Sequence, residues 1–137
     1  MQGLIQIEGI DLARVIPNIF QFGNTGANFF SNQNEFLQVG QIYYPQDHKI
    51  PSHEHLKVKN EISIINEVLI LVEGKIEVLL YINRKLKHSL IINSGDAIVL
   101  MNGGHGFKML ESSKIIEIKQ GPYMGDLDKV RFDDTSK

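Results

Sequence analysis

Two histidines separated by one residue, His53 and His55, are the first place in this sequence where side chains could chelate a metal ion. In an extended backbone, successive side chains alternate between two faces, so both imidazoles would point to the same side. A third imidazole, His105, follows a glycine-rich turn at Gly103 and Gly104. A strand that returns from this turn would bring His105 to the same cavity.

Each of these residues also has a simpler interpretation. A pair such as His53 and His55 is often only a polar surface pair, and His105 is equally explained as a hydrogen-bonded histidine at the start of a strand. Glu67 precedes an apolar run, and it is either an inward ligand or a solvent-facing residue at a strand entry. A buried carboxylate without a positive partner is costly, so an inward Glu67 would itself indicate a cation.

Composition restricts the class of protein. The chain has 137 residues, 42% hydrophobic and 22% charged, which predicts one soluble domain with its own core. The formal net charge of -2 gives no basic surface for nucleic acid or acidic membranes. Cysteine is absent, so a metal would have to be bound by imidazole, carboxylate, backbone or water. The start of the chain lacks the pattern of a signal peptide, and the longest apolar run, 68–72, is too short to cross a bilayer, so we expect a cytoplasmic protein.

The first half of the chain has weak periodicity. Residues 4–10 alternate loosely and predict a short strand that pairs outside the main sheet or with a second copy of the chain. Residues 11–16 are interpreted as a brief helical turn that ends before Pro17. Aromatic and β-branched residues over 36–44 predict a strand.

The second half is typical of β-structure. Residues 67–72 and 75–82 flank Glu73 and Gly74, the pattern of a tight β-hairpin. Turns rich in Gly, Asn and Ser then separate further apolar runs at 86–92, 97–101, from 105 onward, and 114–119. No helical stripe is present between residues 36 and 120. Short strands with a turn every eight to twelve residues predict an all-β sandwich or barrel.

These residues resemble the cupin superfamily. His53-Glu54-His55 matches the two histidines of its first motif, and Glu67 is followed by six residues and then a glycine, as in that motif. Eleven residues separate His55 from Glu67, more than the family spacing, so Glu61 is an alternative ligand. The second motif is matched by Gly95, Gly103 and His105, with His105 one position early and Met101 in place of the proline.

The resemblance implies a cupin-type double-stranded β-helix, or jelly roll, with the histidines facing inward near one mouth. The domain would be single, with a core over about 36–120, an N-terminal arm over 1–35 and a C-terminal tail over 121–137. Most cupins hold one divalent transition metal ion. The resemblance therefore implies His53, His55, Glu67 and His105 as ligands of one Fe, Mn, Zn, Ni or Co ion.

Three functions remain open at this point. The first is a metal-dependent enzyme that acts on a small polar molecule. The second is a metal-free protein similar to sugar-nucleotide isomerases and epimerases, with a histidine as general base and a carbohydrate-like ligand. The third is a non-catalytic module that binds a small molecule. No separate catalytic acid or base is evident, and we expect a homodimer that covers an exposed strand edge.

Overall fold

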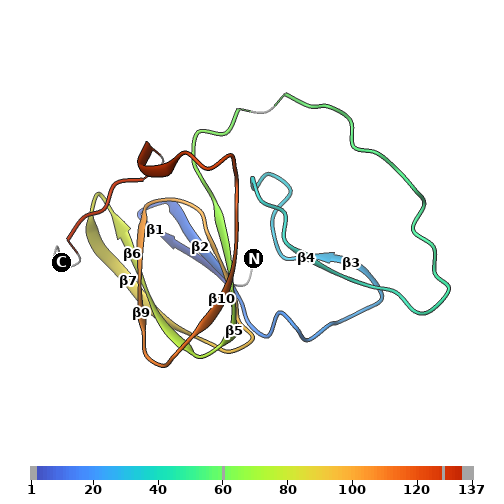
Figure 1. Cartoon of the computed structure of the whole chain (residues 1–137), viewed down its shortest axis with the longest axis horizontal. Coiled ribbons are helices and arrows are strands. Elements are labelled where there is room, and N and C mark those ends of the chain that lie inside the picture. The colour runs from blue at the N-terminus through green and yellow to red at the C-terminus, as the bar shows by residue number, and fades with distance from the viewer. Residues whose placement is uncertain (1–2, 60, 128, 134–137) are drawn as a thin grey trace. The chain divides into compact units, whose positions relative to one another are not determined.

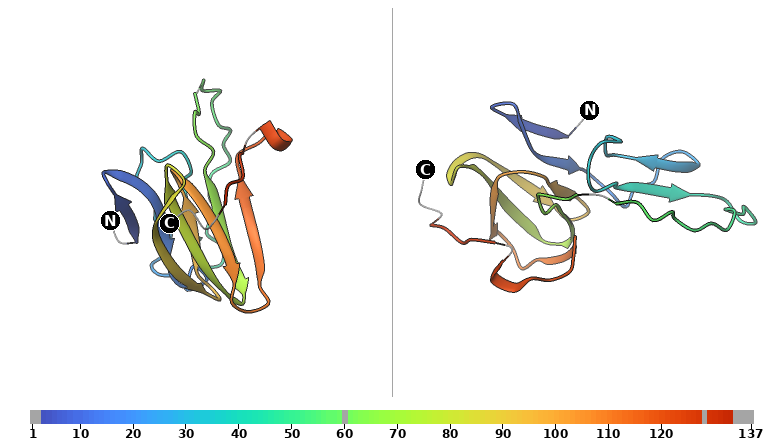
Figure 2. Two further views of the ribbon diagram at one scale, coloured as in Figure 1. Left: turned by 90° about the vertical axis from the view of Figure 1, so that its left-hand side faces the viewer. Right: turned by 90° about the horizontal axis from the view of Figure 1, so that it is seen from above.

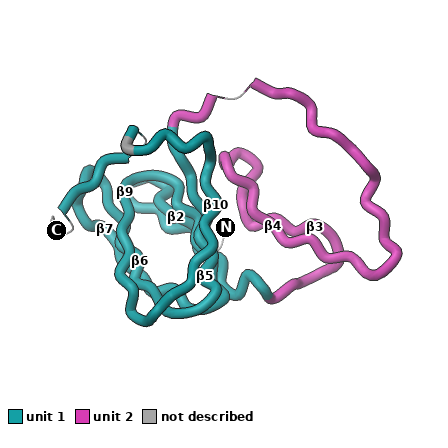
Figure 3. The backbone as a smooth tube through the Cα atoms, in the orientation of Figure 1, with its two compact units in different colours: residues 1–20, 64–137 teal, residues 21–63 magenta. Residues whose placement is uncertain are grey.

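The computed structural model describes residues 3–59, 61–127 and 129–133. The chain forms two compact units, drawn in different colours in Figure 3: unit 1 comprises residues 1–20 and 64–137, and unit 2 comprises residues 21–63. The predicted boundary at residue 36 falls inside unit 2. Residues 3–20 of the predicted arm belong to the same unit as most of the predicted core.

Unit 1 contains two antiparallel sheets (Figure 1). The five-stranded sheet has the order β1 (Leu4–Ile7), β2 (Ile10–Ile16), β8 (Ala97–Leu100), β5 (Glu67–Glu73) and β10 (Lys114–Lys119). The three-stranded sheet has the order β7 (Lys85–Asn93), β6 (Lys75–Ile82) and β9 (Gly104–Met109). A short 3-10 helix, η1 (Gly125–Leu127), follows β10. Neighbouring strands are antiparallel throughout both sheets.

Unit 2 contains one antiparallel pair, β3 (Gly26–Phe29) and β4 (Gly40–Tyr43). The strand predicted over 36–44 is therefore present only at its C-terminal end. The described residues between β4 and β5 form no strand, so His53 and His55 lack the regular strand that would place both imidazoles on one face.

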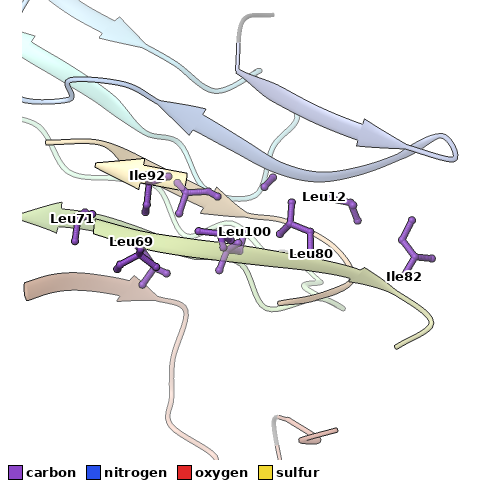
Figure 4. Close-up of a cluster of buried hydrophobic side chains, with 11 residues drawn as sticks. Leu12, Leu69, Leu71, Leu80, Ile82, Ile92 and Leu100 are labelled. Carbon is purple, nitrogen blue, oxygen red and sulfur yellow. The ribbon is translucent and has the colours of Figure 1, made fainter. Parts of the chain in front are cut away.

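The core of unit 1 lies between its two sheets (Figure 4). Because side chains alternate along a strand, every second residue of β5 and β6 faces inward. The five-stranded sheet contributes Leu12, Ala13, Leu69, Leu71, Ile98 and Leu100, and the three-stranded sheet contributes Ile76, Val78, Leu80, Ile82 and Ile92. The all-β class predicted from the sequence is thus confirmed.

The helical turn predicted over residues 11–16 is wrong, because this segment is strand β2. β1 and β2 form an antiparallel pair at one end of the five-stranded sheet (Figure 2). β2 also pairs with the fully buried strand β8. Pairing on both sides and the burial of Leu12 and Ile16 outweigh the weak local preference for a turn.

The tight hairpin predicted around Gly74 is also wrong, although both of its strands are present. β5 pairs with β8 and β10, whereas β6 pairs with β7 and β9. Gly74, with a φ of 114°, is the point at which the chain passes from one sheet to the other. A Cβ atom there would lie 2.7 Å from the carbonyl oxygen of Ser112, so the close approach of that segment requires glycine.

The remaining turns follow the sequence pattern. Asn83 and Arg84 both have positive φ in the two-residue turn between β6 and β7, as expected for a tight hairpin. The carboxylate of Asp96 accepts hydrogen bonds from the backbone N–H groups of Asn93 and Asn18. Among the described residues, no helix has the length and apolar character required to cross a membrane.

Candidate functional site

Glu67 and His105 come together at one end of unit 1. Glu67 is the first residue of β5 and faces inward, since it is directly opposite Leu100 and alternates with Leu69 and Leu71. His105 lies on β9 directly opposite the buried Leu80, so it faces the same interior from the other sheet. Its Nε2 atom lies 3.8 Å from the Glu67 carboxylate.

Strand β10 adds two charged side chains to this pair. Lys119 is directly opposite Glu67 in the sheet, and Glu117, two residues earlier, shares the same face. Glu117 forms a side-chain hydrogen bond with Glu67, and the Nζ atom of Lys119 lies 3.9 Å from Glu117. The ammonium group of Lys119 also lies 5.9 Å from the ring centre of Tyr123. Glu67, His105, Glu117 and Lys119 are called the polar cluster below.

Neighbouring contacts position the two central residues of the polar cluster. Before Glu67, the backbone N–H of Asn66 donates to the side chain of Gln120, and the Asn66 amide donates to the carbonyl of Met101. Before His105, Gly104 lies against the ring of Phe132, where a Cβ atom would be 2.9 Å from that ring.

The C-terminal tail packs beside the polar cluster through Phe132. Phe132 is edge-to-face with Tyr81 at 5.0 Å between ring centres. Phe132 therefore holds the tail against unit 1, whereas the neighbouring Val130 is exposed.

Burial shifts the pKa values of Glu67 and His105 in the directions that favour the neutral form of each group. Burial raises the pKa of Glu67, and the charge and hydrogen bond of Glu117 raise it further, against the opposing charges of Lys119 and Lys129. Burial lowers the pKa of His105; the charge of Glu117 raises it by less, and the charge of Lys129 lowers it slightly further. The site thus presents a carboxyl group that holds its proton more strongly than usual beside an imidazole that holds its proton less strongly.

Replacing Glu67 with glutamine is expected to stabilise the metal-free protein at neutral pH. A raised folded-state pKa means that the folded protein binds more protons than the unfolded chain, so this group lowers stability as the pH rises above the ordinary glutamate pKa. Glutamine can still donate to Glu117 but carries no charge. Urea denaturation from pH 4 to 8 should give the variant a larger free energy of unfolding than the wild type at pH 7. The difference between the two proteins should shrink as the pH falls toward 4. Equal stability of both proteins at every pH would contradict the buried position of the charge.

His53 and His55 lie in unit 2 and are both exposed. Their ring centres are 5.3 Å apart with an edge-to-face arrangement. The Nδ1 atom of His53 lies 2.9 Å from the carbonyl oxygen of Pro51, so a proton on Nδ1 can donate to that oxygen and leave Nε2 with a free lone pair. Glu61, the alternative ligand, is also an exposed residue of unit 2.

The four predicted ligands are therefore divided between two units, with His53 and His55 in one and Glu67 and His105 in the other. The four-ligand site remains a prediction. Within the residues that the structure describes, no group of three or more His, Asp or Glu side chains is arranged as a preformed metal site.

Glu117 and Lys119 were not predicted from the sequence as site residues. They lie on the predicted strand 114–119, and alternation alone would have placed them on one face. The sequence does not specify the register between β5 and β10. This register sets Lys119 opposite Glu67 and brings Glu117 within hydrogen-bonding reach of Glu67.

Comparison of the chain with protein-family models, with curated proteins and with solved structures gives no match.

Proposed function

We propose that this protein is a cupin-like protein that binds one divalent transition metal ion at the polar cluster and uses it to bind or transform a small polar molecule. The observation that carries the proposal is the hydrogen-bonded pair of inward-facing carboxyl groups, Glu67 and Glu117, beside the imidazole of His105. Two neighbouring carboxylates repel each other when both are ionised, and a cation between them would remove that repulsion.

The donor atoms suit such an ion. Two carboxylates and one imidazole are ligands for Fe(II), Mn(II), Zn(II), Ni(II) or Co(II). Small rotations of Glu67 and His105, whose nearest atoms are 3.8 Å apart, would bring both to coordination distance. Ligation by His53 and His55 remains a prediction from the sequence. A bound ion would act as a Lewis acid toward an oxygen atom of the bound molecule.

The neighbouring residues of the chain would orient that molecule. Lys119 is mostly buried at the same end of unit 1 and offers a positive charge to an anionic or hydroxyl group. Tyr123 is exposed beside Lys119 and offers an aromatic face at the solvent side. The combination favours a compact, oxygen-rich ligand over an extended apolar one.

Equilibrium dialysis against Zn(II), Mn(II) or Co(II), followed by elemental analysis, tests the proposal. We expect close to one ion per chain in the wild type. In Glu67→Gln and His105→Gln the affinity should fall about 100-fold or more, because loss of an outer-shell partner alone costs about 10- to 100-fold. His53→Ala and Glu61→Gln, measured in parallel, decide whether unit 2 contributes ligands.

His88→Gln is the matched control, because His88 is an exposed imidazole of unit 1 on β7. Its affinity should equal that of the wild type. A wild-type protein without bound metal, or a Glu67→Gln, His105→Gln double variant that retains full affinity, would refute the metal site.

The opposite pKa shifts favour a second candidate, a metal-free acid and base site of the sugar-nucleotide isomerase or epimerase kind. A carboxyl group that keeps its proton and a neutral imidazole beside it can act as proton donor and proton acceptor. Here Glu67 would donate and the neutral His105 would accept. Calorimetric binding of a nucleotide sugar by metal-free protein, lost in His105→Gln, would support this candidate over the first.

A further inference from the structure

Strand β10 is an edge of the five-stranded sheet. It follows β5 at the end of the strand order, and no strand in the described part of the chain pairs with its outer side (Figure 1). An edge strand presents a row of backbone N–H and C=O groups that can bind another extended strand.

The outward face of β10 is apolar. Ile116 and Ile118 are 51% and 52% exposed, and Val72 on the adjacent strand β5 is also exposed on this face. The edge strand β7 of the other sheet is different, since most of its exposed residues are charged or polar: Lys85, Lys87, His88 and Ser89. Charged residues are a common protection of edges against pairing. The residues of β10 that follow Lys114 on this face, Ile116 and Ile118, carry no charge.

We propose that β10 pairs antiparallel with β10 of a second copy of this chain, about a twofold axis beside Ile116. This pairing would join two five-stranded sheets into one continuous sheet and bury the exposed isoleucines of both copies. The inference is independent of the metal site.

Charge excludes one register and permits this one. Opposed residues of an antiparallel pair share a face, so a twofold axis can pass only beside a residue and its own counterpart. An axis beside Glu117 would set two carboxylates directly opposite each other, which is destabilising. An axis beside Ile116 sets isoleucine against isoleucine, Ile118 against the aliphatic stem of the partner's Lys114, and Glu117 against the partner's Ile115. No like charges are opposed in this register.

Analytical ultracentrifugation over a wide concentration range tests the pairing. The wild type should approach the mass of two chains at high concentration, and Ile118→Lys should have the mass of one chain throughout. Ile91→Lys is the matched control, since Ile91 is 53% exposed on β7, an edge strand of the three-stranded sheet, and this variant should associate as the wild type does. Circular dichroism of each variant establishes that it is folded.

The absence of cysteine from the chain allows a test of the register. Directly opposed residues have Cα atoms about 4.5 to 5.5 Å apart, within the range for a disulfide. Ile116→Cys should therefore form a covalent dimer under mild oxidation, and Ile91→Cys should form it at least tenfold more slowly. A wild type of single-chain mass at every concentration, a dimer that persists in Ile118→Lys, or equal cross-linking at both cysteines would overturn the proposal.

Discussion

Replacing Leu80 with alanine is expected to lower the free energy of unfolding by about 2–5 kcal/mol, the range for deletion of a large buried aliphatic side chain. Leu80 is 1% exposed and packs inside the cluster between the two sheets. It is also directly opposite His105, so the cavity would open beneath the polar cluster. Urea denaturation followed by circular dichroism measures the loss.

Ile91→Ala is the control for Leu80→Ala, because it shortens an exposed side chain on the neighbouring strand of the same sheet. This substitution should lower the free energy of unfolding by less than about 1 kcal/mol, which is the scale of β-propensity differences. If the two substitutions cost the same, the interior of unit 1 would not lie between the sheets as described.

Replacing Gly103 with alanine is expected to lower the free energy of unfolding by roughly 3 kcal/mol. The same change at Gly9 should lower it by less. Both glycines have left-handed backbones, with φ values of 77° and 75°, so alanine is strained at either position. A Cβ atom at Gly103 would overlap the carbonyl oxygen of Tyr81 and approach Leu12, whereas at Gly9 no atom lies within 4 Å. Only Gly103→Ala requires the backbone before His105 to move.

Thermal unfolding of both alanine variants separates these contributions. Gly9→Ala reports the conformational strain alone, and the difference between the variants reports the overlap at Gly103. An equal loss at the two positions would show that the segment before His105 is free to shift.

The strands of unit 1 were largely predictable because their side-chain pattern is local. The apolar run 97–101 coincides with β8, which is buried along its whole length. The alternating run 114–119 coincides with β10. Local pattern did not reveal that residues 11–16 form a strand, because β2 is stabilised by partners distant in the sequence.

Pairing was less predictable than the strands themselves. A glycine after a strand is compatible with a hairpin or with a crossing between sheets, and only the different pairing partners of β5 and β6 distinguish the two. The site shows the same limit. Glu67 and His105 were identified as chemically important residues, but the contribution of Glu117 depends on the register between β5 and β10, which composition and spacing do not specify.

The crossing at Gly74 also has a consequence for how the chain folds. The strands on either side of it complete different sheets, and β5 needs β8 and β10, which are synthesised later. A nascent chain that ends after β7 can form the β6–β7 hairpin but must leave β5 without either neighbour. Folding of unit 1 therefore depends on late, long-range contacts, which predicts slow acquisition of structure relative to helical proteins of this size.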